Sequence, residues 1–379
     1  MNRIAFYAPL KPPDHPIPSG DRAIARLLMS ALAEAGMAVE LASGFRSYDA
    51  AGDPARQQRL RQLGERQAAR LIARYRRRPP AQRPDLWLTY HLYHKAPDWI
   101  GPAVSRALGI PYVIAEASYA HKQRQGPWRL GLEASRDCFE QAALALCLNP
   151  TDKPGLGAIA PQLALADLLP FIATGPLLAE PRVDKAALAQ SYGLDPTRPW
   201  LISVAMMRPG AKLRSYQLLA DAMAQLSAAS WELLLVGDGE ARAAVAQAFA
   251  PVPHCHLLGA LDHARLIPLL HASELLLWPA IDEAFGMALL EAQACATAVV
   301  AGQEGGVASI VAEGISGRLV PARDATAFAS TVAALLRDPT TLRQMQQAAR
   351  RRIAQYHSLE GAAQRLQQLL RPLLPRRDD

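Results

Sequence analysis

Short apolar runs alternate with segments of helical periodicity along the whole chain. In the segment 24–35, apolar residues return every three or four positions, which predicts a helix that ends at Gly36. The apolar runs of the first half predict buried strands at 3–9, 37–43, 85–91, 111–116 and 143–149. Because strands that alternate with helices form parallel sheets covered on both faces, we expect an α/β protein.

The same alternation resumes after a looser stretch near the middle of the chain. Proline recurs and the periodicity is lost in 168–184, which predicts a linker between two domains. Predicted strands then follow at 200–206, 231–237, 254–259, 274–280 and 297–302, and a last helix runs from near Ser358 to about Leu370. We expect ligands where the carboxyl ends of the strands lead into helices.

The composition agrees with a globular protein of two domains. The chain has 379 residues, of which 50% are hydrophobic and 20% are charged. Its four cysteines stand far apart among apolar neighbours, which indicates reduced core thiols rather than disulfides or a metal site. The first residues do not resemble a signal peptide, and no stretch approaches the ~18 apolar residues of a membrane span. We therefore expect a cytoplasmic protein.

The positive charge is concentrated in one segment. The formal net charge is +7, and residues 55–78 contain nine Arg and one Glu. A solvated helix face is one interpretation, and an anionic partner is the other. Interleaved apolar residues favour a membrane surface, at the inner face of the cytoplasmic membrane; they are Leu60, Leu63, Leu71, Ile72 and Tyr75. No zinc spacing, aromatic RNA-binding signature or helix-turn-helix pattern supports a nucleic-acid partner.

Two junctions between a predicted strand and a helix carry residues suited to an anionic ligand. Ser19 or Asp21 can cap the first helix, and Gly20 between them lets backbone approach a ligand closely. Arg208 and Lys212 follow the first strand of the second domain, where a guanidinium fork and an ammonium suit a diphosphate. For these two cations, ordinary exposure at the surface stays open as the alternative.

A third junction, "DEAFGMALLEAQA" at 282–294, places seven residues between Glu283 and Glu291. A helix is predicted from Phe285, so Glu283 lies just before the helix and Glu291 about two turns inside it. The free N–H groups of the first turn, Met287 included, favour an anion such as pyrophosphate, and Gly286 leaves room for it. Each carboxylate then reaches a different polyhydroxy group. A sugar nucleotide has that layout of sugar, diphosphate and ribose.

The region "DEAFGMALLEAQACATAVVAGQEGGVASIVAEGISGRLV" resembles the donor-site signature of glycosyltransferase family 4. "VGDGE", "RPGAK" and "PSGDRAIARLL" fall at the family's other expected places. The resemblance implies a GT-B fold, with two Rossmann-like domains facing a cleft and a last helix crossing back to the first. The domains it implies are an acceptor domain at 1–172, a donor domain at 173–356 and the returning helix at 357–379. It also implies a retaining, metal-independent enzyme that uses a nucleotide sugar as donor; we expect no cofactor and a UDP or GDP sugar.

The resemblance also assigns roles to single residues. It implies that Arg208 and Lys212 hold the diphosphate, Glu283 the sugar hydroxyls and Glu291 the ribose. It also implies that backbone around Gly259–Leu261 meets the base. Arg208, Lys212 and Glu283 are thereby expected in catalysis. One departure from the family is the pair Ala308 and Ser309, where Pro-Glu is frequent.

The first domain offers polar groups at the ends of two predicted strands. His91, His94 and Lys95 lie at or just after the end of the third strand, and Glu116 and His121 at or just after the end of the fourth. We expect His91 in the catalytic site and the other four around a saccharide or lipid-linked acceptor. For any single histidine here, a structural role is an equal alternative.

Three functions remain open on the sequence alone. The first is a glycosyltransferase of cell-envelope glycan or glycolipid synthesis. A nucleotide-sugar epimerase on the same scaffold is the second, and a non-catalytic protein that binds sugar nucleotides is the third. Fold alone does not decide between them.

Overall fold

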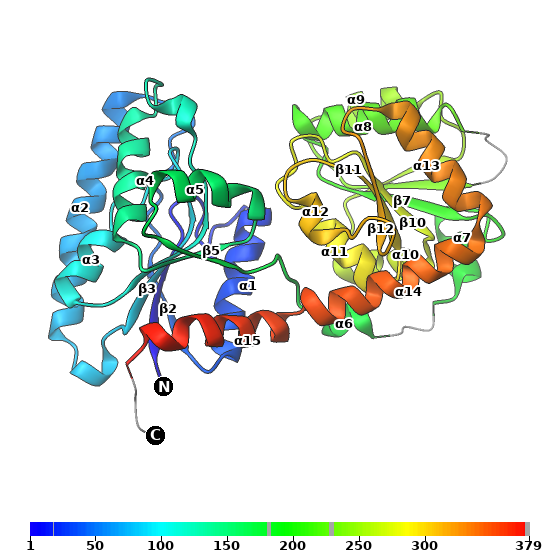
Figure 1. Cartoon of the computed structure of the whole chain (residues 1–379). Coiled ribbons are helices and arrows are strands. Elements are labelled where there is room, and N and C mark those ends of the chain that lie inside the picture. Colours follow the sequence, from blue (N-terminus) through cyan, green and yellow to red (C-terminus); the bar gives the residue numbers. More distant parts are fainter. Residues whose placement is uncertain (18, 180–182, 227–230, 376–379) are drawn as a thin grey trace. The chain divides into compact units, whose positions relative to one another are not determined.

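The computed structural model describes residues 1–17, 19–179, 183–226 and 231–375. The chain forms two compact units (Figure 1). The first contains Met1–Leu169 together with the C-terminal segment from Leu359, and the second is Pro170–Ser358. Each unit is built on a six-stranded sheet.

The first sheet has the strand order β2-β1-β3-β4-β5-β6, and every pairing is parallel. Its strands are β1 (Arg3–Tyr7), β2 (Ala38–Ser43), β3 (Leu86–Leu92), β4 (Tyr112–Ala117), β5 (Leu144–Cys147) and β6 (Ala164–Asp167). The helices of this unit are α1 (Gly20–Glu34), α2 (Pro54–Arg77), α3 (Gly101–Leu108), α4 (Arg129–Gln141), α5 (Lys153–Ile159) and α15 (Leu359–Leu370), with 3-10 turns η1 (Pro80–Gln82), η2 (His121–Gln123), η3 (Pro150–Asp152) and η5 (Arg371–Leu373). The last long helix, α15, packs against α1.

The second sheet has the order β12-β11-β10-β7-β8-β9, again all parallel. Its strands are β7 (Trp200–Val204), β8 (Glu232–Val236), β9 (Cys255–Gly259), β10 (Leu275–Trp278), β11 (Ala298–Gly302) and β12 (Gly317–Val320). The helices are α6 (Gly175–Leu178), α7 (Lys185–Tyr192), α8 (Ala211–Met223), α9 (Arg242–Phe249), α10 (His263–Ala272), α11 (Met287–Ala294), α12 (Val307–Ile310), α13 (Ala325–Arg337) and α14 (Pro339–Tyr356). The predicted fold of two parallel α/β sheets is confirmed.

The strands read as continuous apolar runs because helices cover both faces of each sheet. All four residues of β10 and all five of β11 are buried. The Arg-rich helix α2 also contributes to this interior: Leu71 is 2% exposed and Tyr75 is fully buried. The expectation that these two residues face a membrane is therefore wrong. The many arginines around them suggested an exposed helix, but both side chains belong to the core of the first unit. Leu63, at 38% exposure, stays at the surface.

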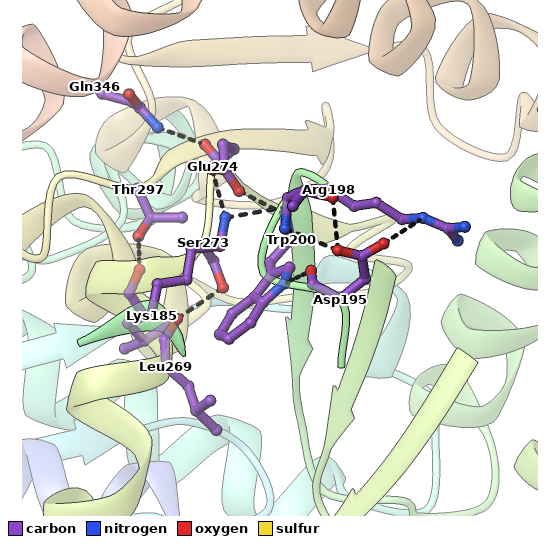
Figure 2. A network of polar contacts seen from close by, with 11 residues as sticks. Lys185, Asp195, Arg198, Trp200, Leu269, Ser273, Glu274, Thr297 and Gln346 are labelled. Atoms are coloured by element: carbon purple, nitrogen blue, oxygen red, sulfur yellow. Dashed lines mark hydrogen bonds and ion pairs between the residues drawn. The ribbon is translucent and has the colours of Figure 1, made fainter. Parts of the chain in front are cut away.

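The amino ends of the second sheet are tied together by one carboxylate (Figure 2). Glu274 accepts hydrogen bonds from Lys185 Nζ at 2.9 Å and from the backbone N–H of Trp200 at 2.5 Å. The side-chain amide of Gln346 donates to the Glu274 carbonyl at 2.9 Å. These bonds join α7, β7, β10 and α14 at the edge opposite to the strand ends where ligands bind in such sheets. The network stabilises the unit at its amino edge and involves no residue at the carboxyl edge, where we look for the functional site.

Candidate functional site

The loop after β10 is held in an unusual backbone conformation. Ala280 and Asp282 have φ of 57° and 50°, a left-handed region that residues with a β-carbon rarely adopt. The glycines of the neighbouring loop after β11 allow close contact: a β-carbon on Gly305 would lie 1.9 Å from the carbonyl oxygen of Glu283. The N–H of Gly306 donates to the Ala284 carbonyl at 2.8 Å. These contacts fix where Glu283 stands.

From this loop, Glu283 contacts Lys212 of α8 and Trp278 of β10. Lys212 Nζ donates to Glu283 Oε2, and Trp278 Nε1 donates to the same oxygen at 3.0 Å. Lys212 Nζ also lies 5.0 Å from the centre of the Trp278 ring. The Glu283 side chain is 14% exposed and that of Lys212 is 29% exposed, so both remain accessible. Two predicted site residues that are far apart in sequence therefore form one ion pair.

Arg208 lies in the loop between β7 and α8, close in sequence to Lys212. Arg208 is exposed, and its guanidinium forms no ion pair with any residue that the structure describes. The loop itself is well anchored, because a β-carbon on Gly239 would lie 2.4 Å from the Met207 carbonyl oxygen. In addition, the N–H of Met207 donates to the Asp238 carbonyl at 2.9 Å. Arg208 is thus a cation on a rigid loop, with no ion-pair partner among the described residues.

Helix α11 begins later than the sequence predicts. It starts at Met287, and Gly286 precedes it with φ of 80°. This left-handed residue stops the helix from extending back to Phe285, whose side chain is buried at 4% exposure. The prediction of a helix from Phe285 is therefore wrong, and the unpaired N–H groups of the first turn begin at Met287.

Glu291 lies on α11, within reach of the loop after β9. Its carboxylate Oε1 is 3.7 Å from His263 Nε2, and its side chain is 21% exposed. Burial raises the pKa of Glu291, and the nearby His263 partly opposes this shift. Leu261 lies in the loop between β9 and α10, two residues before His263, which begins α10, and is half-buried. A carboxylate in this setting suits hydrogen bonds from hydroxyl groups better than contact with a phosphate.

In the first unit, His91 and Glu116 end β3 and β4 side by side. His91 Nδ1 lies 3.0 Å from Asp21 Oδ1 and 3.9 Å from Glu116 Oε1. Burial by itself lowers the pKa of His91, but the carboxylates of Glu116, Asp21 and Asp152 outweigh it and raise the pKa to about 8. No local pattern in the sequence predicts either aspartate in this role. Asp21 is a possible helix cap by its position, but Ser19 caps α1 by accepting from the Arg22 N–H at 3.2 Å.

The remaining predicted residues of the first unit have other contacts. Lys95 Nζ lies 4.3 Å from the centre of the Trp128 ring, and the His94 ring packs edge-on against the same tryptophan at 5.8 Å. His121 packs edge-on against Tyr119 at 5.2 Å. A β-carbon on Gly20 would meet no atom within 4 Å, so open space lies above that turn. The acceptor role of these residues stays a prediction.

Comparison with known proteins gives the family of the second unit. Residues 184–352 match the family described as glycosyl transferases group 1. This region belongs to that family. The resemblance read from the sequence is thereby confirmed for the unit that carries Lys212, Glu283 and Glu291.

Two curated relatives are similar in sequence to this chain over part of their length. A D-inositol 3-phosphate glycosyltransferase of Frankia alni is 31% identical over 66% of this chain and 65% of its own. An alpha-maltose-1-phosphate synthase of Mycobacterium tuberculosis is 33% identical over 49% of this chain and 48% of its own. The matches thus span less than two thirds of either relative.

Solved structures extend the similarity to both units. Sucrose-phosphate synthase from Thermosynechococcus elongatus is 20% identical, covers 98% of this chain and 99% of its own, and has a TM-score of 0.72. HepE of Anabaena, solved in complex with UDP, is 16% identical, covers 98% of this chain and 100% of its own, and has a TM-score of 0.75. At these identities the comparison establishes the fold.

Two further predictions concern cysteines and membranes. Cys138, Cys147 and Cys295 are buried and Cys255 is half-buried, and all four are free thiols. In the part of the chain that the structure describes, no helix has the length and apolar character needed to cross a bilayer.

Proposed function

We propose that this protein is a retaining glycosyltransferase, which moves a sugar from a UDP or GDP sugar to a saccharide or lipid-linked acceptor in cell-envelope glycan or glycolipid synthesis. The observation that carries the proposal is the meeting of Lys212 and Glu283 beside the N-terminus of α11. A cation, a carboxylate and free N–H groups lie together there. The UDP and UDP-glucose complexes of HepE support this class of donor.

In this proposal the cations bind the diphosphate. Arg208 has no ion-pair partner among the described residues, so its guanidinium can bind two phosphate oxygens without breaking an existing ion pair. Lys212 must exchange its bond to Glu283 for a phosphate oxygen. The N–H groups that begin at Met287 add to the same binding site. Two cations beside the leaving diphosphate neutralise the charge that a metal ion neutralises in other transferases, which is why we propose a metal-independent reaction.

The two glutamates then bind different hydroxyl groups. Once Lys212 turns to the phosphate, Glu283 is free to accept from hydroxyls of the transferred sugar. That ring gains positive charge as its bond to phosphate breaks, so a carboxylate beside it stabilises the transition state. Glu291 accepts from the ribose, and backbone near Leu261 meets the base. For retention, the acceptor hydroxyl approaches the sugar from the same face that the diphosphate leaves. The leaving phosphate takes the proton of that hydroxyl, so no enzymatic base is required.

Steady-state kinetics of Glu283→Gln and Glu291→Gln test these roles. Glu291→Gln is expected to raise KM for the donor more than it lowers kcat, because the ribose hardly changes during transfer. Glu283→Gln is expected to lower kcat by about 100-fold or more. A pure KM effect in both variants contradicts the transition-state role of Glu283. Product from the donor alone, epimerised and without acceptor, supports an epimerase instead.

We also propose that α2 binds an anionic membrane surface at the inner face of the cytoplasmic membrane. Arg59, Arg66, Arg70 and Arg77 are exposed, and none forms an ion pair within the described ranges. Their spacings of 7, 4 and 7 residues bring all four within about 20° of one line along the helix, roughly 27 Å long. Leu63 lies at the edge of this line. Exposed cations in a row suit anionic lipid headgroups.

Flotation with vesicles tests the membrane proposal. A variant with these four arginines changed to glutamine is expected to lose binding to anionic vesicles, and wild-type binding is expected to fall as salt rises. The matched control changes Arg337, Arg343, Arg351 and Arg371, which are also exposed, to glutamine. Equal loss in both variants indicates a general effect of net charge. Equal binding to neutral and anionic vesicles, or to neither, leaves α2 as a solvated helix.

A further inference from the structure

Two neighbouring strands of the first sheet end in the same rare backbone conformation. His91 in β3 and Glu116 in β4 have φ of 60° and 58°. This left-handed region is unfavourable for side chains with a β-carbon and recurs at functional sites, where the surrounding structure holds it. The two side chains meet, with His91 Nδ1 3.9 Å from Glu116 Oε1. The strand ends therefore serve to bring these groups together.

Asp21 approaches the same ring nitrogen from another element. It lies in the first turn of α1, and its Oδ1 is 3.0 Å from His91 Nδ1. Ser19 caps that helix, so the Asp21 carboxylate is not needed as the cap. Burial acts to raise the pKa of Asp21, but the hydrogen bond and charge of His91 lower it overall, which keeps Asp21 ionised. An anion thus faces Nδ1 directly.

Apart from one lysine, the other groups around the His91 ring are acidic or aromatic. Glu116 and Asp152 add negative charge, from β4 and from η3, and burial raises the pKa of both. The rings of Tyr93 and Tyr90 pack against the imidazole, with distances between ring centres of 5.1 and 5.8 Å. Lys11, after β1, is a cation that acts on Asp21. The balance of these groups favours the protonated ring.

The geometry leaves one ring nitrogen for a ligand. Nδ1 faces the two carboxylates, whereas Nε2 makes no hydrogen bond to any residue that the structure describes. The side chain is 22% exposed, so a ligand can reach it. In a doubly protonated ring, Nε2–H donates a hydrogen bond and cannot accept a proton.

We propose that Asp21 is a positioning residue that keeps His91 doubly protonated, so that its Nε2–H donates a hydrogen bond to a substrate oxygen and His91 does not act as a base. The inference rests on the proposed function only in naming a glycosyl-transfer substrate. The oxygen belongs either to the donor or to an acceptor hydroxyl. No proton is transferred, because Asp21 acts only by holding the charge and the orientation of the ring.

The first test measures His91 itself and needs no activity. In the full chain labelled with ¹⁵N-histidine, His91→Gln identifies the imidazole signals of His91, which are expected to titrate near pH 8. Asp21→Asn is expected to lower that pKa and to loosen the preference for Nδ1–H. Glu34→Gln is the matched control: it removes one carboxylate at the far end of α1, roughly 20 Å away, and is expected to leave the pKa unchanged. An unchanged pKa in Asp21→Asn overturns the proposal.

The second test follows activity with pH. Wild-type kcat/KM is expected to fall above pH 8, and in Asp21→Asn this fall is expected at lower pH, in step with the pKa measured by NMR. The variant is expected to lose about tenfold at pH 7.5 and less than threefold at pH 6, where the ring is protonated in both proteins. A loss that is equal at every pH indicates a merely structural role. Activity that rises as His91 deprotonates indicates a base, and both outcomes overturn the proposal.

Binding measurements distinguish the source of the oxygen. The affinities for the UDP sugar and for UDP are measured by calorimetry at pH 6 and pH 8.5. If His91 donates to the donor, the affinity depends on pH, and Asp21→Asn changes that dependence. If the oxygen belongs to the acceptor, donor binding stays constant and only the acceptor KM follows the His91 titration. If no nucleotide sugar supports turnover, the proposed function fails, and the NMR titration still decides the role of Asp21.

Discussion

The ion pair of Lys212 with Glu283 leads to a prediction that runs against the usual effect of a site mutation. In the proposed function the pair must open before Lys212 binds a phosphate, so Glu283 would compete with the diphosphate for the same ammonium group. Glu283→Gln is therefore expected to tighten the binding of UDP. For the UDP sugar this gain is offset by a weaker bond to the sugar, so that donor affinity changes little.

The magnitude follows from what the substitution leaves in place. A hydrogen bond between charged groups is worth roughly 1.5–3 kcal/mol. In Glu283→Gln the side-chain amide oxygen keeps the shape of the carboxylate and can still accept from Lys212 and from Trp278 Nε1, at roughly 0.5–1.5 kcal/mol for a neutral acceptor. The difference is about 1 kcal/mol, which makes UDP bind about fivefold tighter.

Calorimetric titration with UDP measures this change, and Asp282→Asn is the matched control. Asp282 carries the same charge one position earlier, but its partners are Arg214 at 2.5 Å and Arg323 at 3.3 Å. If a lower negative charge near the site were enough, both variants would tighten binding equally. Equal or weaker binding of UDP by Glu283→Gln, or an equal gain in Asp282→Asn, refutes competition for Lys212.

Three further outcomes are expected. Lys212→Ala is expected to weaken UDP binding by ~1.5–3 kcal/mol, which the same titration measures, and wild-type affinity in this variant contradicts the role of Lys212. Gly305→Ala is expected to lower kcat tenfold or more, because its β-carbon would lie 1.9 Å from the Glu283 carbonyl oxygen. Gly314→Ala is the control: Gly314 also has a positive φ, but its β-carbon would meet no atom within 4 Å, so this variant measures the cost of the backbone conformation alone. Burial lowers the pKa of His357 to about 4, so the folded state resists protonation, and stability that is complete above pH 6.5 is lost as pH falls toward 4. Urea unfolding is expected to show a loss of up to about 3 kcal/mol over that range, and His357→Gln is expected to remove this part of the pH dependence.

The sequence by itself determined the elements and their class. Apolar runs predict the strands because each parallel strand is buried on both faces. The strand must therefore be apolar throughout, and this can be read from the run of residues alone. The sequence also placed Arg208 and Lys212 where one strand leads into a helix, Glu283 in the loop after another strand and Glu291 within the helix that follows, since these positions depend only on where the strands end. Family resemblance then assigned their roles.

Tertiary structure decided which of these groups meet. Lys212 and Glu283 are 71 residues apart, and Asp21 and His91 are 70 apart, so no local pattern links them. Their contacts depend on the order and register of strands in each sheet, which bring separate loops to one edge.

The start of α11 and the orientation of α2 also required the folded chain. A helix can continue through a glycine, and only the left-handed conformation of Gly286 in the folded chain fixes the start at Met287. In α2, Leu71 and Tyr75 fit a membrane-facing stripe and a core-facing stripe equally well by spacing. The first sheet buries them, because an apolar face covers the nearest apolar surface of its own unit, and this leaves the row of exposed arginines outside.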